Sequence, residues 1–209
     1  MNFLSHIPEH ITSRTKCLIM LHGVWSNEWD LFVLKEKFGN DLIVISLRWP
    51  FILWQDRFAW YPVDFSSGKP VYKTQDLETG YREIISCIDE VRSKYDISPE
   101  NIFLLGFSQW AIMAYYTLWR SPEKIGGIIA LSGRLLDEID PDAVDPDDYA
   151  GKRVFIGHGV DDTMIPVTAT GPMSLFARKL GIEPTVKFYP IGHAIAPEEI
   201  ADIRTWIGY

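Results

Sequence analysis

The sequence has little of what would link it to nucleic acid, to an anionic membrane or to an oxidising compartment. Its 20 basic residues are outnumbered by 28 acidic residues, and the formal net charge is −8 at pH 7. We therefore expect no basic patch that would bind nucleic acid or an anionic membrane surface. The only cysteines, Cys17 and Cys87, both lie within apolar patterns. Reduced thiols in a core are expected, and not a disulfide.

Long apolar runs are also missing. No stretch reaches the roughly 20 residues that a membrane-spanning helix needs, so stable membrane insertion is not expected. The first eight residues lack a basic segment followed by a long apolar run, which predicts no signal peptide and a cytoplasmic location. No internal repeat is visible. With 209 residues, 47% of them hydrophobic, the chain can bury a substantial core, and we predict a single domain over residues 1–209.

Short apolar runs alternate with helical patterns along the whole chain. The runs at 16–21 and 42–47 are continuous, which is typical of strands buried on both faces of a sheet. Such alternation predicts an α/β fold with a mostly parallel central sheet and helices on both faces. Further strands are predicted at 101–105, 125–133, 153–157 and 185–190, and helices at 28–38, 76–95, 111–119 and 171–180 and from Pro197 onward.

Between residues 48 and about 74 the regular pattern is lost. Prolines and a glycine interrupt this segment, yet it is rich in aromatic side chains, among them Trp54 and Trp60. A long loop this apolar is not typical of a solvated linker. We predict a lid-like loop that folds over a site.

Ser108 lies between a predicted strand and a predicted helix, in the stretch Leu104-Leu105-Gly106-Phe107-Ser108-Gln109-Trp110. A serine in this context, with glycine two residues before it, is typical of a nucleophile elbow, in which a tight turn lifts Oγ above the sheet. The motif is incomplete, because the second glycine of G-x-S-x-G is Trp110 here. Ser108 is therefore a candidate nucleophile that needs support from elsewhere in the chain.

Asp162 and His193 supply that support. Each comes just after a predicted strand, as Ser108 does, and the carboxyl ends of parallel strands meet at one edge of a sheet. The chain order serine, aspartate, histidine is the order found in α/β-hydrolases. A serine hydroxyl needs a neighbouring base to become a good nucleophile, and a carboxylate can fix the tautomer of that base. The three residues therefore predict a catalytic triad.

Four motifs follow one another along the chain: Leu21-His22-Gly23, Gly106-Phe107-Ser108-Gln109, His158-Gly159 with Asp162 and Ile165-Pro166, and Gly192-His193. Together they resemble the small phospholipase/carboxylesterase family, which includes bacterial carboxylesterases and acyl-protein thioesterases. The resemblance implies an α/β-hydrolase fold and a serine esterase acting on small acyl esters, with thioesters and lysophospholipids as further candidates. It implies no cofactor and no metal, and it assigns the oxyanion hole to the backbone N–H groups of Val24 and Gln109.

Other residues compete for these roles. Asp161 is adjacent to Asp162, but the family spacing selects Asp162 and leaves Asp161 as a turn residue. His158 and His22 are expected to order their loops, while His6 and His10 are expected at the surface. A metal site built from His22, His158 and nearby acids lacks a recognised ligand spacing. Whether the chain is a monomer or a homodimer is left open by the sequence.

Tryptophans replace glycines that the family usually has. Trp110 and Trp25 stand close to the predicted nucleophile and oxyanion donor, and an added indole there would narrow the site or weaken the reaction. The alternative function is therefore a catalytically weakened hydrolase-fold protein that binds a small apolar ligand. The predicted substrate-binding residues are Trp25, Trp54, Trp60, Trp110 and Ile165.

Overall fold

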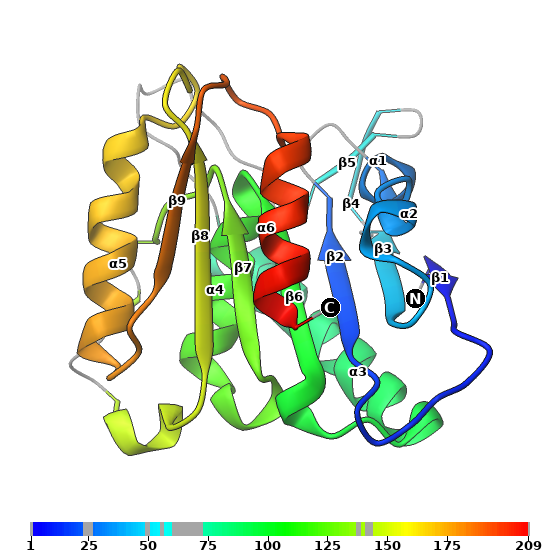
Figure 1. The fold of residues 1–209 in the computed structure, drawn as a ribbon. Helices are drawn as coiled ribbons and strands as arrows, with labels where there is room; N and C mark the ends of the chain where they lie inside the picture. Colours follow the sequence, from blue (N-terminus) through cyan, green and yellow to red (C-terminus); the bar gives the residue numbers. More distant parts are fainter. Residues whose placement is uncertain are drawn as a thin grey trace.

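A seven-stranded sheet lies between two layers of helices (Figure 1). The computed structural model describes residues 2–22, 27–48, 51–54, 57–59, 73–136, 139–140 and 144–208. The strand order is β1-β3-β2-β6-β7-β8-β9, and every neighbouring pair is parallel except β1 with β3. The strands are β1 (Asn2–His6), β2 (Cys17–Leu21), β3 (Ile43–Arg48), β6 (Ile102–Phe107), β7 (Gly127–Leu131), β8 (Arg153–Gly159) and β9 (Thr185–Tyr189).

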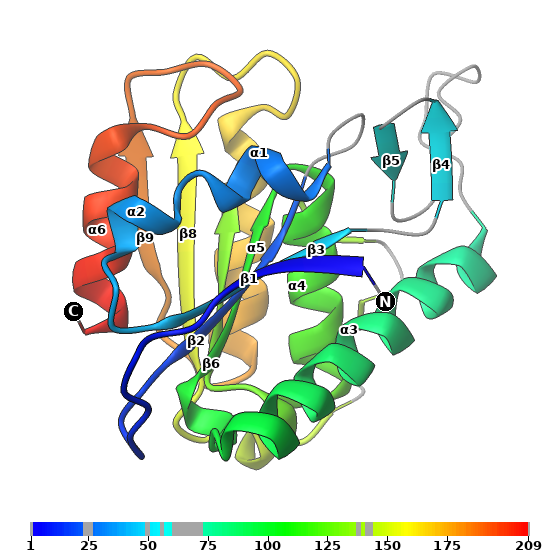
Figure 2. The same ribbon diagram turned by 90° about the vertical axis from the view of Figure 1, so that its right-hand side faces the viewer.

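The helices cover both faces of the sheet, as the alternation of strands and helices predicts (Figure 2). On one face, α3, α4 and α5 pack on strand residues such as Ile19 and Ile45. On the other, α1, α2 and α6 pack on Leu18, Met20 and Val44. Successive strand residues point to opposite faces, so these continuous apolar runs fill both cores. The helices are α1 (Glu28–Phe32), α2 (Lys35–Phe38), α3 (Thr74–Tyr95), α4 (Gln109–Arg120), α5 (Thr170–Lys179) and α6 (Pro197–Ile207).

The helix predicted from Glu28 to Phe38 is in fact two short helices. Asn27 begins the first, because its side chain accepts a hydrogen bond from the N–H of Trp29 at 2.9 Å. After this helix the backbone forms a tighter turn, in which the N–H of Leu34 donates to the carbonyl of Leu31, three residues earlier. Phe32 and Phe38 both reach the core.

Three further strands, β1, β4 and β5, were not predicted. β1 pairs antiparallel with β3, so His6 is half-buried in a strand and not at the surface, whereas His10 is exposed. The segment from 48 to 74 was predicted to be irregular, but Phe51–Trp54 (β4) pairs antiparallel with Arg57–Ala59 (β5). Aromatic and β-branched residues favour strands, and the nearby prolines interrupt only the flanks. The predicted lid role concerns residues that mostly lie outside the described ranges.

The order of the strands fixes where a site can form. The chain passes from β2 outward to β3 and returns to β6 on the other side of β2. Open α/β sheets bind ligands at such a reversal, beyond the carboxyl ends of the strands. Among the described helices, none is both long and apolar enough to cross a membrane.

Candidate active site

Ser108 occupies the turn between β6 and α4 in a backbone conformation that residues with side chains rarely adopt. Its φ is 63° and its ψ is −123°. Its N–H donates to the carbonyl of Leu131 in β7 at 2.8 Å, which holds the turn against the sheet. A Cβ at Gly106 would overlap the backbone carbonyl of Trp110, so this glycine lets the helix start close to the strand. The local geometry is that of a nucleophile elbow.

His193 links Ser108 to Asp162. Its Nε2 lies 2.9 Å from the Oγ of Ser108, and its Nδ1 lies 2.7 Å from Oδ2 of Asp162. The three side chains come from the segments after β6, β8 and β9, and they form one continuous hydrogen-bonded chain. The imidazole also packs against Phe107, the residue before the serine, with 4.8 Å between ring centroids. The side chain of His193 is 19% exposed and Ser108 is half-buried, so the serine end of this chain lies close to solvent.

The carboxylate of Asp162 is buried but well supplied with donors. Its Oδ1 accepts from the backbone N–H groups of Met164 and Ile165, each at 2.9 Å. Burial alone would raise the pKa of this carboxyl, but the hydrogen bond from His193 and the two backbone donors hold the pKa below its ordinary value. Asp162 is therefore ionised at neutral pH and can stabilise an imidazolium.

His158 closes the loop that carries Asp162. Its side chain is fully buried, and its Nε2 lies 2.8 Å from the carbonyl of Ile165 and 3.5 Å from Oδ2 of Asp162. A donor on Nε2 therefore faces two oxygen acceptors of the same loop. This position agrees with the expectation that His158 orders the loop and is not the base.

The loop after β8 and the loop after β9 are joined by their backbones. The N–H of Asp161 donates to the carbonyl of Ile191 at 3.0 Å, and Asp161 itself is exposed. A Cβ at Gly159 would overlap the carbonyls of Ile191 and Gly192, so the two loops touch through backbone atoms. Asp162 and His193 are thereby held at a fixed separation.

The predicted oxyanion hole is described only in part. Gln109 is the first residue of α4 and is buried directly after Ser108. The first N–H groups of a helix point away from it and favour negative charge. Val24 and Trp25 lie outside the described residues. Before them, His22 is fully buried and packs against Trp110 with 5.0 Å between ring centroids.

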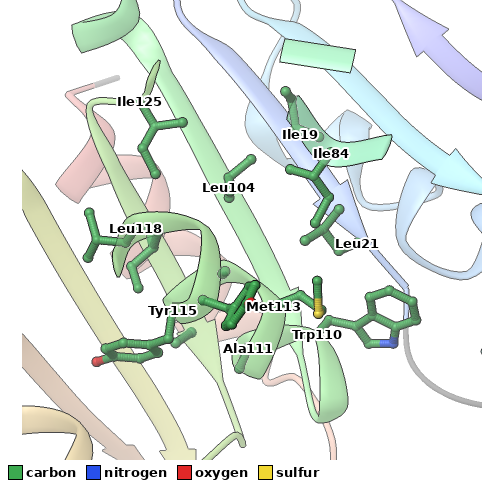
Figure 3. Close-up of a cluster of buried hydrophobic side chains, with 14 of the residues drawn as sticks. Ile19, Leu21, Ile84, Leu104, Trp110, Ala111, Met113, Tyr115, Leu118 and Ile125 are labelled. Carbon is green, nitrogen blue, oxygen red and sulfur yellow. The ribbon is translucent and has the colours of Figure 1, made fainter. Parts of the chain in front are cut away.

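Two of the predicted substrate-binding side chains, Trp110 and Ile165, lie within the described residues. Trp60 and the side chain of Trp54 lie outside the described part of the chain, and Ile165 is half-buried beside Asp162. Trp110 was predicted to contact substrate, but its indole has no exposed surface and packs in the core (Figure 3). The indole lies against the buried ring of His22, the residue that follows β2, and this packing removes it from solvent.

Two buried carboxylates near this edge were missed by sequence reasoning. Glu28, at the start of α1, accepts two hydrogen bonds from Arg48 at the end of β3, and the Nε contact is 2.7 Å. Glu199, in the first turn of α6, is 2% exposed. The helix-opening sequence Pro197-Glu198-Glu199 was the only local signal for Glu199, and the pairing of Glu28 with Arg48 had none.

Comparison with known proteins shows the family of this chain. The family model described as Phospholipase/Carboxylesterase matches residues 4–209. The chain belongs to this family. Relatives in this family carry hydrolase names, among them a carboxylesterase and an acyl-protein thioesterase.

Individual relatives of this family member are distant. It is 27% identical over 153 residues to the carboxylesterase SOBER1 of Arabidopsis thaliana, covering 71% of this chain and 66% of that protein. It is 32% identical over 151 residues to acyl-protein thioesterase 1 of Kluyveromyces lactis, covering 69% and 65%. These alignments thus span just under two thirds of both relatives. The putative hydrolase MhqD of Bacillus subtilis is 26% identical over 97% of each chain.

Solved structures agree with the fold. The Bacillus cereus carboxylesterase superposes with a TM-score of 0.83 at 21% identity, over 99% of this chain and 93% of that one. Esterase PE8 superposes with a TM-score of 0.79 at 24% identity, over 99% and 96%. At these identities the likeness establishes the α/β-hydrolase fold alone.

Proposed function

We propose that this phospholipase/carboxylesterase family member is a serine carboxylesterase that cleaves acyl esters through an acyl-enzyme. The observation that carries the proposal is the hydrogen-bonded chain from Ser108 through His193 to Asp162, with Ser108 at a φ of 63°. Thioesters and lysophospholipids are further candidate substrates, because relatives include a carboxylesterase and an acyl-protein thioesterase.

The geometry supports each proton transfer of such a reaction. His193 Nε2, at 2.9 Å, takes the proton of Ser108 Oγ as that oxygen attacks the ester carbonyl. The imidazolium is stabilised by Asp162, and Nε2 then returns the proton to the departing alkoxide. Water repeats the sequence on the acyl-enzyme and releases the acid. The carbonyl oxygen becomes negative in both steps, and we assign its donors to the N–H groups of Gln109 and Val24.

The alternative of a plugged, ligand-binding site rested on tryptophans that fill the cleft. The indole of Trp110 is fully buried and belongs to the hydrophobic core cluster, which supports a packing role for this residue. The role of Trp25 in that alternative stays a prediction, because this residue lies outside the described part of the chain.

A matched pair of serines tests the proposal. Ser108→Ala should lower the turnover of p-nitrophenyl esters by several orders of magnitude, since the loss of a triad nucleophile costs about 10⁶-fold in kcat in a well-studied protease. Ser132 is the control, because it also has a positive φ, 46°, and follows the neighbouring strand β7. Ser132→Ala should keep most of the activity. A fluorophosphonate adduct mapped to Ser132, or full activity in Ser108→Ala, would refute the assignment.

A further inference from the structure

Glu199 is a buried carboxyl group attached to the loop that carries His193. It lies in the first turn of α6, and its Oε2 accepts a hydrogen bond from the N–H of Ala196 at 3.2 Å. Ala196 is three residues after His193. The glutamate therefore holds the backbone between the histidine and the helix.

The same carboxyl group touches the strand that leads to Asp162. A Cβ at Gly157 in β8 would overlap Oε1 of Glu199, so the carboxyl lies directly on the backbone of this glycine. Gly157 is followed by His158, which contacts the Asp162 loop. Glu199 thus spans the two segments whose separation sets the hydrogen bond between His193 and Asp162.

No cation pairs with Glu199 among the described residues, and its charged neighbour is an acid. Asp202 lies one turn along α6, where its Oδ2 accepts from the Tyr189 hydroxyl at 2.9 Å and its Oδ1 lies 3.8 Å from Nζ of Lys187. On α2, which also packs on α6, Lys35 pairs with Glu36 at 3.7 Å and Lys37 is exposed. Burial, reinforced by Asp202 and opposed by the Ala196 N–H, raises the pKa of Glu199 to about 7.

We propose that Glu199 is a positioning residue for His193, and that the gain or loss of one proton by its carboxyl group controls this positioning. The neutral carboxyl fills the space between α6 and β8 and holds the histidine loop at its distance from Asp162. When the proton leaves, the Glu199 carboxylate is a buried negative charge without a cation in the described part of the chain, beside the acidic Asp202. The packing of this carboxylate between α6 and β8 is then weakened. The inference rests on the proposed function, in which His193 is the base.

The kinetic test compares three variants over pH 5–9 with a p-nitrophenyl ester. Glu199→Ala should lower kcat, by up to about 100-fold for a misplacement near 1 Å, with little change in KM. Glu199→Gln keeps the shape without the charge and should restore kcat. The ratio of kcat for Glu199→Gln to kcat for wild type should rise with pH around a midpoint near 7. The control is Glu198→Gln, which changes an exposed neighbour and should give a flat ratio.

A second variant reaches the same contact from the other side. Gly157→Ala would push on Oε1 without removing the carboxyl, and it should reproduce the fall in kcat. If Glu199→Ala does not fold, Gly157→Ala and Glu199→Gln still decide the question. Wild-type kcat in Glu199→Ala, or a ratio for Glu199→Gln that does not vary with pH, overturns the proposal.

A measurement without substrate separates this inference from the proposed esterase function. Glu199 keeps its proton in the folded state up to about pH 7, whereas an ordinary glutamate releases it near 4.5. The melting temperature of Glu199→Gln minus that of wild type should therefore increase as the pH rises from 5 to 7, and this increase is the expected gain. If Ser108→Ala keeps its activity but this gain is seen, the esterase assignment fails and the proton linkage of Glu199 stands. If the gain is absent, the linkage fails.

Discussion

Two adjacent carboxylates, Asp161 and Asp162, have opposite surroundings. Asp162 is buried, and its oxygens accept from His193 and from two backbone N–H groups. Asp161 is exposed, and its backbone N–H donates to the carbonyl of Ile191. The same side-chain chemistry therefore has two functions, set by the turn in which each residue lies.

Conservative substitutions should separate these two functions. Asp162→Asn removes the acceptor that fixes the tautomer of His193, and we expect kcat to fall by on the order of 10⁴-fold, as for the equivalent change in a serine protease. Asp161→Asn keeps the backbone N–H and should change kcat by less than about tenfold. Steady-state kinetics on a p-nitrophenyl ester measures both. A larger loss in Asp161→Asn would mean that our assignment of the acid is off by one residue.

At this scale the sequence predicted the residues that follow strand ends and missed the buried acids. Ser108, Asp162 and His193 could be found because glycines and apolar runs mark the ends of β6, β8 and β9. The burial of Glu199 and Glu28 depends on α6 meeting β8 and on Arg48 reaching α1. Those are contacts between distant parts of the chain, and no local pattern reports them.

At the scale of elements, the packing of α4 on the sheet explains how a tryptophan is tolerated after the elbow. A Cβ at Gly106 would overlap the backbone carbonyl of Trp110, and a Cβ at Gly133 would overlap the Cβ of Ala111, the residue after Trp110. The helix can therefore start close to the strands although its second residue is large. The indole packs beside His22. It belongs to the core cluster on the α3–α4 face of the sheet (Figure 3).

This packing changes the result expected when Trp110 is replaced. If the indole narrowed the site, as the sequence predicts, Trp110→Gly would widen it and favour bulky esters. Because the indole is fully buried, we now expect the variant to lose about 3–5 kcal/mol of unfolding free energy, and about 1 kcal/mol more for glycine in a helix. Urea unfolding measures this loss, and Trp110→Phe should show a smaller one.

The same variants also test the narrowing hypothesis directly. The ratio of kcat/KM for bulky esters to kcat/KM for acetate esters should be nearly unchanged in Trp110→Phe. If this ratio rose clearly while the stability was preserved, the result would show that Trp110 lines the substrate cleft. For Trp25, which lies outside the described residues, the narrowing of the site stays a prediction.

Strands and helices with strong local patterns were predictable, and elements defined by their partners were not. The buried runs of β2, β3, β6 and β7 carry their own signal, as does the apolar stripe of α3. The five residues of β1 are a strand because β3 offers them an edge. The interruption between α1 and α2 brings Phe32 and Phe38 to the core together, and periodicity alone does not require it.

For the whole molecule, one edge of the sheet collects residues that are far apart in the chain. The segments after β6, β8 and β9 bring together Ser108, Asp162 and His193, which lie up to 85 positions apart. Chain order and strand alternation were enough to predict this gathering, because parallel strands end at a common edge. The position of the predicted lid at 48–74 could not be predicted in the same way, because chain order and strand alternation do not indicate which part of the sheet such an aromatic segment covers.

The charges of the whole molecule act on stability in two opposing directions. For Glu28, burial works against ionisation, but the hydrogen bonds from Arg48 outweigh it and lower the pKa; Asp162 behaves alike through His193. Such carboxyls stabilise the fold above their unfolded pKa, and this stabilisation is lost as the pH falls through the folded pKa. Glu199 has the opposite sign, because its pKa is raised to about 7.

The sum of these effects predicts a maximum of stability at mildly acidic pH. The free energy of unfolding in urea should rise from pH 3 to about 5, as Glu28 and Asp162 ionise in the folded protein before they would in the unfolded chain. Between pH 5 and 7 it should fall, since the unfolded chain releases the proton of Glu199 that the folded protein retains; the loss is on the order of 3 kcal/mol. Glu28→Gln should reduce the acidic rise, and Glu199→Gln should remove the later fall. A wild-type curve that climbs steadily to pH 7 would show that the buried carboxyl of Glu199 is ionised without cost, and the curve for Glu199→Gln would then run parallel to it.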